Sequence, residues 1–548
     1  MIDATMMDMP LTTQMILRRG RRLFADSRVS TFDGERLVAL SFAEVADRAA
    51  RLAAALAALG LLQGDRVGTL CWNSNVHLEA YLAAPASGLV LHTLNLRLHA
   101  DQIGWIAAHA EDRAIIVDAD LVDLLSRFAG QLPNLRHVIV NGEADDALLR
   151  GRSFAVHRLS DLLESHPPMT AWPALDERAA AAICYTSGTT GDPKGVVYSH
   201  RSIFLHSLAS LGADAFGVCN ADRVLMMPPM FHANAWGLPY SCWLAGADMI
   251  MPSRHLGPEP VAAMIEAGRP TLTMTVPTIL NDLLARHERQ PIDMASFRMI
   301  IAGGSAVSTH LIERVRSAWD IGLVQGWGMT ETSPMCVLSH PPRGAAASDE
   351  ARWRAKSGRP VAGVEVRLVD DVNEAVAEDG QAVGRLQVRG PWVTGSYLAL
   401  ADARTSDGWF DTGDVGSIDA LGYVQITDRA KDLIKSGGEW ISSVDLENAL
   451  SALPGVGEAA VVAVPHPRWE ERPLAIIAWT EDSEPDFVAL RTRLRETMAK
   501  FMVPEYWSQL PALPKTSVGK IDKRRLREQV AAGDIEIVQE LSFLAEAC

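Results

Sequence analysis

The sequence predicts an α/β fold in which a large N-terminal domain of layered sheets and helices precedes a smaller α+β C-terminal domain. Helical periodicity and short apolar runs alternate over roughly the first 120 residues, which favours a mostly parallel sheet covered by helices. A length of 548 residues is enough for two or more cores. A charged segment, 428–435, precedes a tail of about 115 residues, the size of a small domain. We therefore predict domains at 1–430 and 431–548.

Individual elements follow from spacing. Apolar residues recur at three- and four-residue steps over 41–59, which predicts a helix that Gly60 closes. Further helices are expected at 77–84, where Pro85 should stop the helix, and at 100–110, with strands at 66–71 and 114–117. The segment 341–354, rich in Ala, Arg and Pro, predicts a surface loop. In the tail, strands are expected at 459–464 and 474–479, and a helix at 487–498.

Composition narrows the function. The chain is 48% hydrophobic and 22% charged, as in ordinary soluble proteins, and its net charge of −16 argues against nucleic acid or anionic membranes as default partners. Six cysteines form no CxxC pair, so neither a zinc site nor a disulfide framework is predicted, and the cytosol is the expected compartment. We expect no signal peptide and no membrane span, because no uncharged apolar run reaches about 18 residues.

The strongest motif is a hydroxyl-rich glycine loop between two extended segments, 179–184 and Val196-Val197. Its residues are Tyr185-Thr186-Ser187-Gly188-Thr189-Thr190-Gly191-Asp192-Pro193-Lys194-Gly195. Glycines let backbone N–H groups turn toward an anion, hydroxyls add donors and Lys194 adds charge, so a phosphate grip is favoured over a polar turn. Lys194 precedes Gly195, so this is not the common P-loop.

Two more segments pair glycines with a flat or apolar surface. Met299-Ile300-Ile301-Ala302-Gly303-Gly304-Ser305-Ala306 predicts a strand that runs into a glycine pair, where a flat ring could approach the backbone; a plain strand-to-helix turn is the alternative. In Gln325-Gly326-Trp327-Gly328-Met329-Thr330-Glu331-Thr332, Trp327 offers a face for a base and Thr330 a donor for an α-phosphate. Glu331 offers an oxygen ligand for Mg²⁺; the alternative is a helix start capped by Thr330.

The segment 226–237 contains Met226, Met227, Met230, His232 and Trp236. Taken alone, it predicts a buried turn with a satisfied histidine, because most methionines and aromatic residues lie in cores. Three later motifs are also common local sequences by themselves: the turn 411–414 with Asp414, the charged loop 428–435, and the glycine loop 513–523 with Lys520.

Together and in this order, the motifs resemble the adenylate-forming (ANL) superfamily over about residues 20–530. The resemblance is greatest to bacterial fatty-acyl-CoA synthetases, including the branch that activates 3-(methylthio)propionate. It implies an ATP-dependent acyl-CoA ligase that forms acyl-AMP and then a CoA thioester. ATP and CoA are then co-substrates of the carboxylic acid, Mg²⁺ is a cofactor, and the small domain is mobile. A homodimer is left open.

The resemblance also implies roles. Lys520, Thr330, Glu331 and His232 are expected at the reacting groups, Thr186 and Glu331 at the metal, and Lys431 at the domain hinge. Met230, Trp236 and Ala302 are expected to line the acyl pocket, with Trp236 as its gate. ATP or CoA contacts are expected from Thr186, Ser187, Gly188, Thr189, Thr190, Gly191, Lys194, Gly303, Gly304, Ser305, Gly326, Trp327, Gly328, Asp414, Ile426, Arg429, Lys435, Gly437, Gly438, Glu439 and Trp440.

Several rivals share part of these motifs. An amino-acid adenylating enzyme usually carries Asp after the pocket Phe, whereas Phe231 is followed by His232. An aryl-CoA ligase or a luciferase-like oxygenase would share most motifs. A non-catalytic nucleotide-binding regulator should have lost Lys520, Thr330 or Glu331, and all three are present. The acid is not identified by the sequence, beyond an apolar chain with no charged partner.

Overall fold

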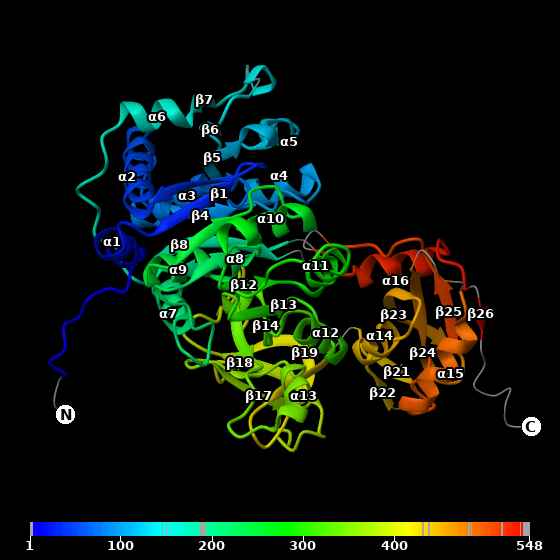
Figure 1. Ribbon diagram of the computed structural model, residues 1–548. Helices are drawn as coiled ribbons and strands as arrows, with labels where there is room; N and C mark the ends of the chain where they lie inside the picture. Colours follow the sequence, from blue (N-terminus) through cyan, green and yellow to red (C-terminus); the bar gives the residue numbers. More distant parts are fainter. Residues whose placement is uncertain are drawn as a thin grey trace, which may run out of the picture.

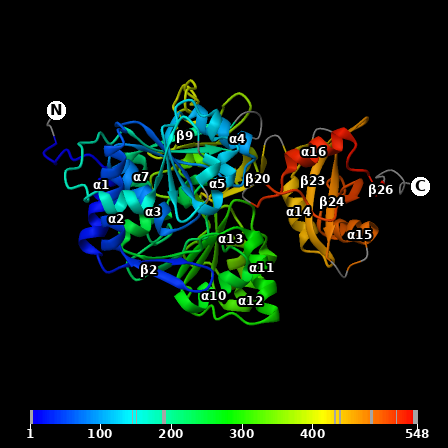
Figure 2. The ribbon, with the colours of Figure 1, turned by 90° about the horizontal axis from the view of Figure 1, so that it is seen from above.

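The computed structural model describes residues 4–144, 146–149, 151–186, 193–429, 432–436, 439–480, 483, 485–516, 519–537 and 539–540. Figure 1 shows a large body that holds most of the chain, and a smaller body formed by the last part, reached through the strands near residue 430. Figure 2, a view from above, separates the same two bodies. The predicted fold class, a large α/β domain followed by a smaller α+β domain, is confirmed.

The first sheet of the large domain has the strand order β7-β6-β5-β3-β4-β8-β9. Its strands are parallel except for the pair β8 and β9, which is antiparallel. The bounds are β3 Arg66–Leu70, β4 Val90–Thr93, β5 Asp112–Asp118, β6 His137–Asn141, β7 Ala155–Arg158, β8 Ala180–Thr186 and β9 Lys194–Ser199. The helices that alternate with them are α2 Phe42–Ala58, α3 Asn75–Ala86, α4 Ala100–His109, α5 Val122–Ser126, α6 Leu159–Ser165 and α7 His200–Ser210.

The second sheet has the order β16-β15-β14-β13-β12-β10-β11-β1-β2, parallel in its centre and antiparallel at both edges. The strands are β1 Arg28–Phe32, β2 Leu37–Ser41, β10 Arg223–Leu225, β11 Asp248–Met251, β12 Leu272–Thr275, β13 Met299–Gly303, β14 Leu323–Gly328, β15 Met335–Leu338 and β16 Arg359–Pro360. The associated helices are α1 Thr13–Leu23, α8 Ala233–Trp236, α9 Leu238–Ala245, α10 Pro258–Gly268, α11 Pro277–Arg289, α12 Thr309–Trp319 and α13 Glu350–Arg354.

Three hydrophobic cores show how these elements are layered. The largest lies between the two sheets and joins Tyr81 of α3 and Trp243 of α9 to both of them. A second fills the outer face of the second sheet under α10, α11 and α12, and a third fills the outer face of the first sheet under α4 and α5. Because parallel strands bury both faces, helices cover each sheet on both sides.

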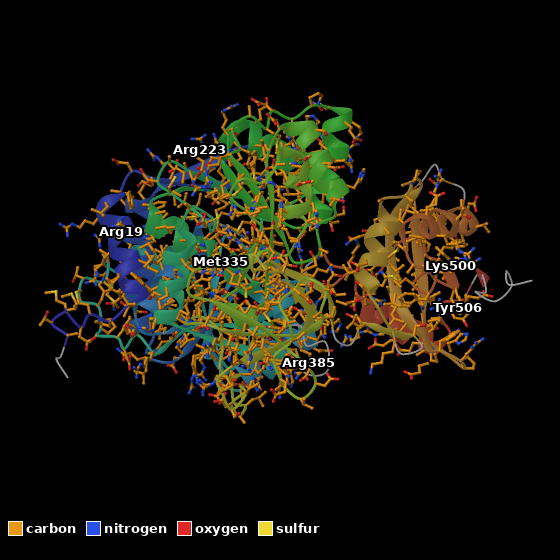
Figure 3. All side chains as sticks on the ribbon, turned by 90° about the horizontal axis from the view of Figure 1, so that it is seen from below. Arg19, Arg223, Met335, Arg385, Lys500 and Tyr506 are labelled. Atoms are coloured by element: carbon orange, nitrogen blue, oxygen red, sulfur yellow. The ribbon has the colours of Figure 1, made fainter. Side chains whose placement is uncertain are left out.

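A third, antiparallel sheet, β17-β18-β19-β20, completes the large domain and leads to the small one. Its strands are β17 Glu365–Val369, β18 Gly384–Arg389, β19 Phe410–Ile418 and β20 Val424–Arg429. Met335 lies within the packed interior of the large domain, whereas Lys500 and Tyr506 belong to the small domain (Figure 3).

The small domain has its own core on both faces of one sheet. The strands are β21 Ile434–Ser436, β22 Glu439–Ile441, β23 Val456–His466, β24 Glu470–Trp479, β25 Tyr506–Gln509 and β26 Gln539–Glu540. Helices α14 Ser443–Ser451 and α15 Phe487–Thr497 pack on one face, and α16 Lys523–Ala532 packs on the other. The boundary at 430/431 itself stays a prediction, because both residues lie outside the described part of the chain.

Most predicted elements are confirmed, and two details were wrong. The helix expected at 41–59 is α2, where Ser41 and Glu44 form a capping box. Pro85 does not stop its helix, because α3 continues to Ala86. Proline removes the N–H that would bond the Tyr81 carbonyl, and the Tyr240 hydroxyl supplies that bond instead, at 3.1 Å. The end of the loop expected at 341–354 forms helix α13.

Candidate functional site

Lys520 of the small domain lies against the glycine pair at the end of β13. A Cβ atom placed on Gly304 would come 3.1 Å from Cε and 3.6 Å from Nζ of Lys520. Gly304 also has φ +83°, which favours glycine. Two motifs that stand more than two hundred residues apart in the sequence are therefore in contact.

The ion pair of Asp414 and Arg429 lies within electrostatic reach of Lys520. Asp414 of β19, buried, accepts a hydrogen bond from Trp327 Nε1 at 2.9 Å and pairs with Arg429 Nε of β20 at 2.7 Å. Burial raises the pKa of Asp414, while Arg429, the Trp327 N–H and Lys520 lower it. The structure thus brings together Lys520 and three residues from the motifs at 325–332, 411–414 and 428–435.

Burial controls the charges at the centre of the site. Burial first, and then the charge of Arg429, lower the pKa of Lys520 from 10.5 to about 8, against the opposite effect of Asp414. The pKa of His232 falls from 6.5 to about 3 through burial, with smaller effects of Lys520 and Arg97. At neutral pH His232 is therefore uncharged, and Lys520 carries the positive charge.

A second group of motif residues surrounds Glu331. Thr330 and Glu331 are buried on the single turn Thr330–Thr332 that follows β14. Tyr198 of β9 donates to the Thr330 carbonyl at 2.7 Å, and Tyr397 donates to Glu331 Oε1 at 2.8 Å. The Tyr397 ring lies under Lys194, whose Nζ is 5.0 Å from the ring centroid.

Glycine is required where the second motif turns. A Cβ atom on Gly328 would come 1.6 Å from the carbonyl oxygen of Pro334, and one on Gly326 would come 2.9 Å from the Leu338 side chain. No other residue fits at Gly328 without moving the backbone. This close approach places the turn with Thr330 and Glu331 directly beyond the strand that carries Trp327.

The segment 226–232 is held by side chains from the loop and the helix that follow β3. Asn73, which follows β3, donates to the carbonyls of Met226 and Pro228 and accepts from the Met230 N–H, at 2.7 to 2.8 Å. The Tyr81 hydroxyl donates to the Met230 carbonyl. Both backbone polar groups of Met230 are therefore fixed, and its side chain is fully buried.

The short element α8, which follows His232, is a strained left-handed turn and not a regular α-helix. Ala233, Asn234, Ala235 and Trp236 all have positive φ, between 43° and 58°, and Gly237 continues with φ +78°. Such left-handed backbone costs roughly 1–2 kcal/mol per residue, and strain of this kind is typical of ligand sites. The turn directs Trp236 to Gly303, where its ring carbons come 3.3 and 3.5 Å from a Cβ placed on that glycine. Ala302, beside Gly303, is buried.

The remaining predicted residues lie further out or outside the described chain. Ile426 lies on β20, Ser305 is exposed, and Lys435 lies on β21, with its N–H bonded to Glu471 at 2.9 Å. Thr186 and Lys194 are paired across the β8–β9 hairpin. Outside the described residues are Ser187, Gly188, Thr189, Thr190, Gly191, Lys431, Gly437 and Gly438, together with the side chains of Glu439 and Trp440.

Sequence reasoning missed four residues of the site. Tyr397 contacts Glu331 and Lys194, Arg97 lies 5.6 Å from the Phe231 ring, and Asn73 and Tyr81 fix Met230. None of the four belongs to a glycine-rich or charged motif. Their roles follow only from the contact of loops and strands that are distant in the sequence.

The Glu331 carboxylate is a suitable ligand for Mg²⁺ that is bound together with a nucleotide. Mg²⁺ usually takes one or two carboxylates and completes its shell with phosphates and water, so a lone buried glutamate is sufficient. Among the described residues no group of three His, Cys, Asp or Glu side chains could hold a metal by itself. Tyr397 occupies Oε1 of Glu331, and within the described chain no hydrogen bond reaches Oε2.

Comparison with known proteins finds matching enzyme families and similar CoA ligases. Residues 20–398 match the AMP-binding enzyme family and residues 445–520 match the AMP-binding enzyme C-terminal domain. A 3-methylmercaptopropionyl-CoA ligase of Ruegeria lacuscaerulensis is 40% identical, covering 96% of this chain and 98% of the relative. A long-chain-fatty-acid–CoA ligase of Thermus thermophilus is 41% identical, covering 96% and 97%.

Solved structures agree with the sequence relatives. An anthranilate CoA ligase in complex with anthranoyl-AMP superposes with a TM-score of 0.85 at 26% identity, covering 96% of this chain and 99% of that one. ATP-bound MatB from Rhodopseudomonas palustris superposes with a TM-score of 0.80 at 26% identity, covering 95% and 99%. In sequence, in fold and in the order of its motifs, this chain belongs to the AMP-binding enzyme family.

Proposed function

We propose that this protein is an ATP-dependent acyl-CoA ligase. It joins a carboxylic acid to CoA through an acyl-AMP intermediate and releases pyrophosphate and AMP. The observation that carries the proposal is the position of Lys520 against Gly304, within electrostatic reach of uncharged His232 and of the Asp414–Arg429 pair. Family membership and two CoA ligases at 40% and 41% identity support the same reaction class.

In the first step, a carboxylate oxygen attacks the α-phosphorus of ATP and the bond to pyrophosphate breaks. Lys520 neutralises the two anions as they approach, and Thr330 donates to the α-phosphate. The preorganised charge matters most in the transition state, in a site that is largely shielded from water. Asp414 and Arg429 bind the ribose, and Trp327 and the Gly303–Gly304 turn accommodate the adenine.

Glu331 and Thr186 would hold Mg²⁺, which neutralises phosphate charge when it is bound. Lys194 and the loop 186–195 bind the triphosphate. In the second step, the CoA thiol attacks the acyl carbon of acyl-AMP and AMP leaves. The segment 435–440 serves this step, with Gly437 and Gly438 alongside the pantetheine arm and Lys431 as the pivot.

The acyl group is proposed to be neutral and either unsubstituted or a thioether: a medium- or long-chain fatty acid, or a short thioether acid such as 3-(methylthio)propionate. Met226, Met230 and Trp236 are apolar, and Met230 and Ala302 are fully buried beside the site. Aryl and arylalkanoic acids are the second candidate, because the anthranilate CoA ligase shares the fold.

A panel of acids tests the proposal. Saturated acids from about C3 to C18, 3-(methylthio)propionate, phenylpropionate, glycine and malonate are assayed for CoA-dependent AMP release, and kcat/KM is compared. We expect a neutral aliphatic or thioether acid to be best. If glycine or malonate gave the highest kcat/KM, the assigned substrate class would be contradicted. If none of the acids in the panel supported AMP release, the ligase assignment would be contradicted.

Location and assembly are further proposals. Among the described residues no helix is both long and apolar enough to cross a bilayer. The five described cysteines are free. We place the enzyme in the cytoplasm, where thiols stay reduced. Sedimentation of the purified protein tests the homodimer that the resemblance leaves open.

A further inference from the structure

Residues 391–400 form a loop, here called the strap, that connects the two phosphate-side motifs. On one side the Thr394 N–H bonds the Glu331 carbonyl at 2.8 Å, and the Ser333 hydroxyl bonds the Trp392 carbonyl at 2.8 Å. On the other side the Leu398 N–H bonds the Gly195 carbonyl at 2.8 Å. The strap therefore contacts both the turn of Glu331 and the strand that begins at Lys194.

Tyr397 is the strap residue that reaches both charged side chains. Its hydroxyl donates to Glu331 Oε1 at 2.8 Å, and its ring lies 5.0 Å from Lys194 Nζ. The ring packs edge-on against Phe410 of β19, with centroids 6.3 Å apart, which limits its motion. One aromatic side chain thus touches the carboxylate assigned to Mg²⁺ and the lysine assigned to the triphosphate.

We propose that Tyr397 is a positioning residue that sets the geometry of the Mg²⁺–triphosphate site through two separable contacts. The hydroxyl fixes the Glu331 carboxylate and leaves Oε2 for the metal. The ring holds the Lys194 ammonium by a cation–π contact. This inference rests on the proposed function, because it takes Glu331 and Lys194 as the ligands of metal and phosphate.

The two contacts predict different effects for two substitutions. Tyr397→Phe removes only the hydroxyl, so Glu331 loses a charge-assisted hydrogen bond while the ring remains under Lys194. Tyr397→Leu removes both contacts. A purely structural role of the tyrosine would instead lower stability without changing the dependence on Mg²⁺.

The first measurement is the free Mg²⁺ concentration that gives half-maximal acid-dependent pyrophosphate release at saturating ATP. We expect this concentration to rise roughly 10- to 150-fold in Tyr397→Phe, as for the loss of a hydrogen bond to a charged group. Tyr423→Phe is the matched control. This substitution removes another buried hydroxyl, which lies away from the site and donates to the His340 carbonyl at 2.5 Å. It should leave the Mg²⁺ requirement unchanged.

The second measurement needs no turnover: the rise in Tm caused by AMP, by ATP with EDTA, and by ATP with Mg²⁺. In Tyr397→Phe only the Mg²⁺-dependent part of the rise should shrink. In Tyr397→Leu the rise with metal-free ATP should shrink as well, because Lys194 is released. The rise with AMP should equal that of the wild type in both variants.

The outcomes separate this inference from the function on which it rests. A wild-type protein that neither gains Tm with Mg²⁺–ATP nor releases pyrophosphate would overturn the proposed function. A working wild type, with Tyr397→Phe unchanged in both Mg²⁺ measurements, would overturn the role of Tyr397 alone. Equal loss of the AMP and Mg²⁺–ATP responses in Tyr397→Phe would also overturn it, since it would indicate a general structural defect.

Discussion

At the scale of single residues, the surroundings of Lys520 determine its charge. Its half-buried side chain lies against Gly304, where desolvation and Arg429 lower its pKa to about 8. The charged form therefore predominates at neutral pH, but only by about tenfold. In the proposed mechanism the lysine must be protonated to stabilise the anions of the first step, so the adenylation rate should depend on its ionisation.

We predict that the rate of pyrophosphate release in the presence of the carboxylic acid substrate, measured without CoA, falls as the pH rises through about 8. The pKa lies below that of free lysine, so charge is lost at a lower pH than the usual 10.5. A series between about pH 6.5 and pH 10 measures this limb. Lys520→Arg keeps its charge throughout and should lack the limb whatever its absolute rate. An unchanged alkaline limb in Lys520→Arg would assign the titration to another group.

Trp236 gives a second prediction at the residue scale. Since its ring lies on Gly303 at the proposed acyl entrance, Trp236→Ala should change the order of preference among acids of different chain length, with KM for ATP nearly unchanged. Trp243, fully buried and stacked on Phe42 at 4.1 Å, is the matched core tryptophan. Trp243→Phe should lower Tm without changing that order. A large Tm loss in Trp236→Ala with a uniform rate loss for all acids would make Trp236 a core residue.

At the scale of elements, the local sequence predicted those helices and turns that depend on residues close together in the chain. Apolar periodicity and the Ser41–Glu44 capping box define α2 within residues 41–59, and glycine motifs mark the turns after β13 and β14. The local sequence did not predict that α3 continues through Pro85, because the hydroxyl that compensates for the proline belongs to Tyr240, far along the chain. Tyr397 was missed for the same reason: a lone tyrosine in a loop carries no pattern.

The contact between α3 and α9 can be tested as an element. Tyr240→Phe leaves the buried Tyr81 carbonyl without the hydroxyl that bonds it, at a cost of about 1–3 kcal/mol in the free energy of unfolding. In the Pro85→Ala background the new N–H can bond the same carbonyl, so Tyr240→Phe should cost less there. Denaturant unfolding of the four proteins measures the coupling. Equal costs in the two backgrounds would show that proline is not the reason for the tyrosine.

At the scale of the whole molecule, the proposed mechanism has the small domain present separate parts to the site in its two steps. Its Lys520 loop meets the large domain, and α16, which follows that loop, lies well away from β21 and β22 in Figure 1. A contact across the junction holds this arrangement, because Asp428 of β20 accepts from the Ser443 N–H of α14 at 2.8 Å. Within the small domain, Lys523 of α16 donates to the Ser443 hydroxyl at 2.6 Å. In the proposed mechanism this arrangement places Lys520 for adenylation, so we expect the domain to turn before the 435–440 segment serves CoA.

This requirement predicts opposite defects in two variants. Lys520→Ala should lose acyl-AMP formation by several orders of magnitude, because it removes charge stabilisation made mainly in the transition state, yet it should still convert supplied acyl-AMP and CoA to the thioester. Lys431→Pro fixes φ at the predicted pivot, so it should form acyl-AMP and convert it slowly. Pyrophosphate release without CoA follows the first half-reaction, and thioester formation from synthetic acyl-AMP follows the second. Proportional loss of both half-reactions in both variants would mean that one fixed arrangement of the domains serves both steps.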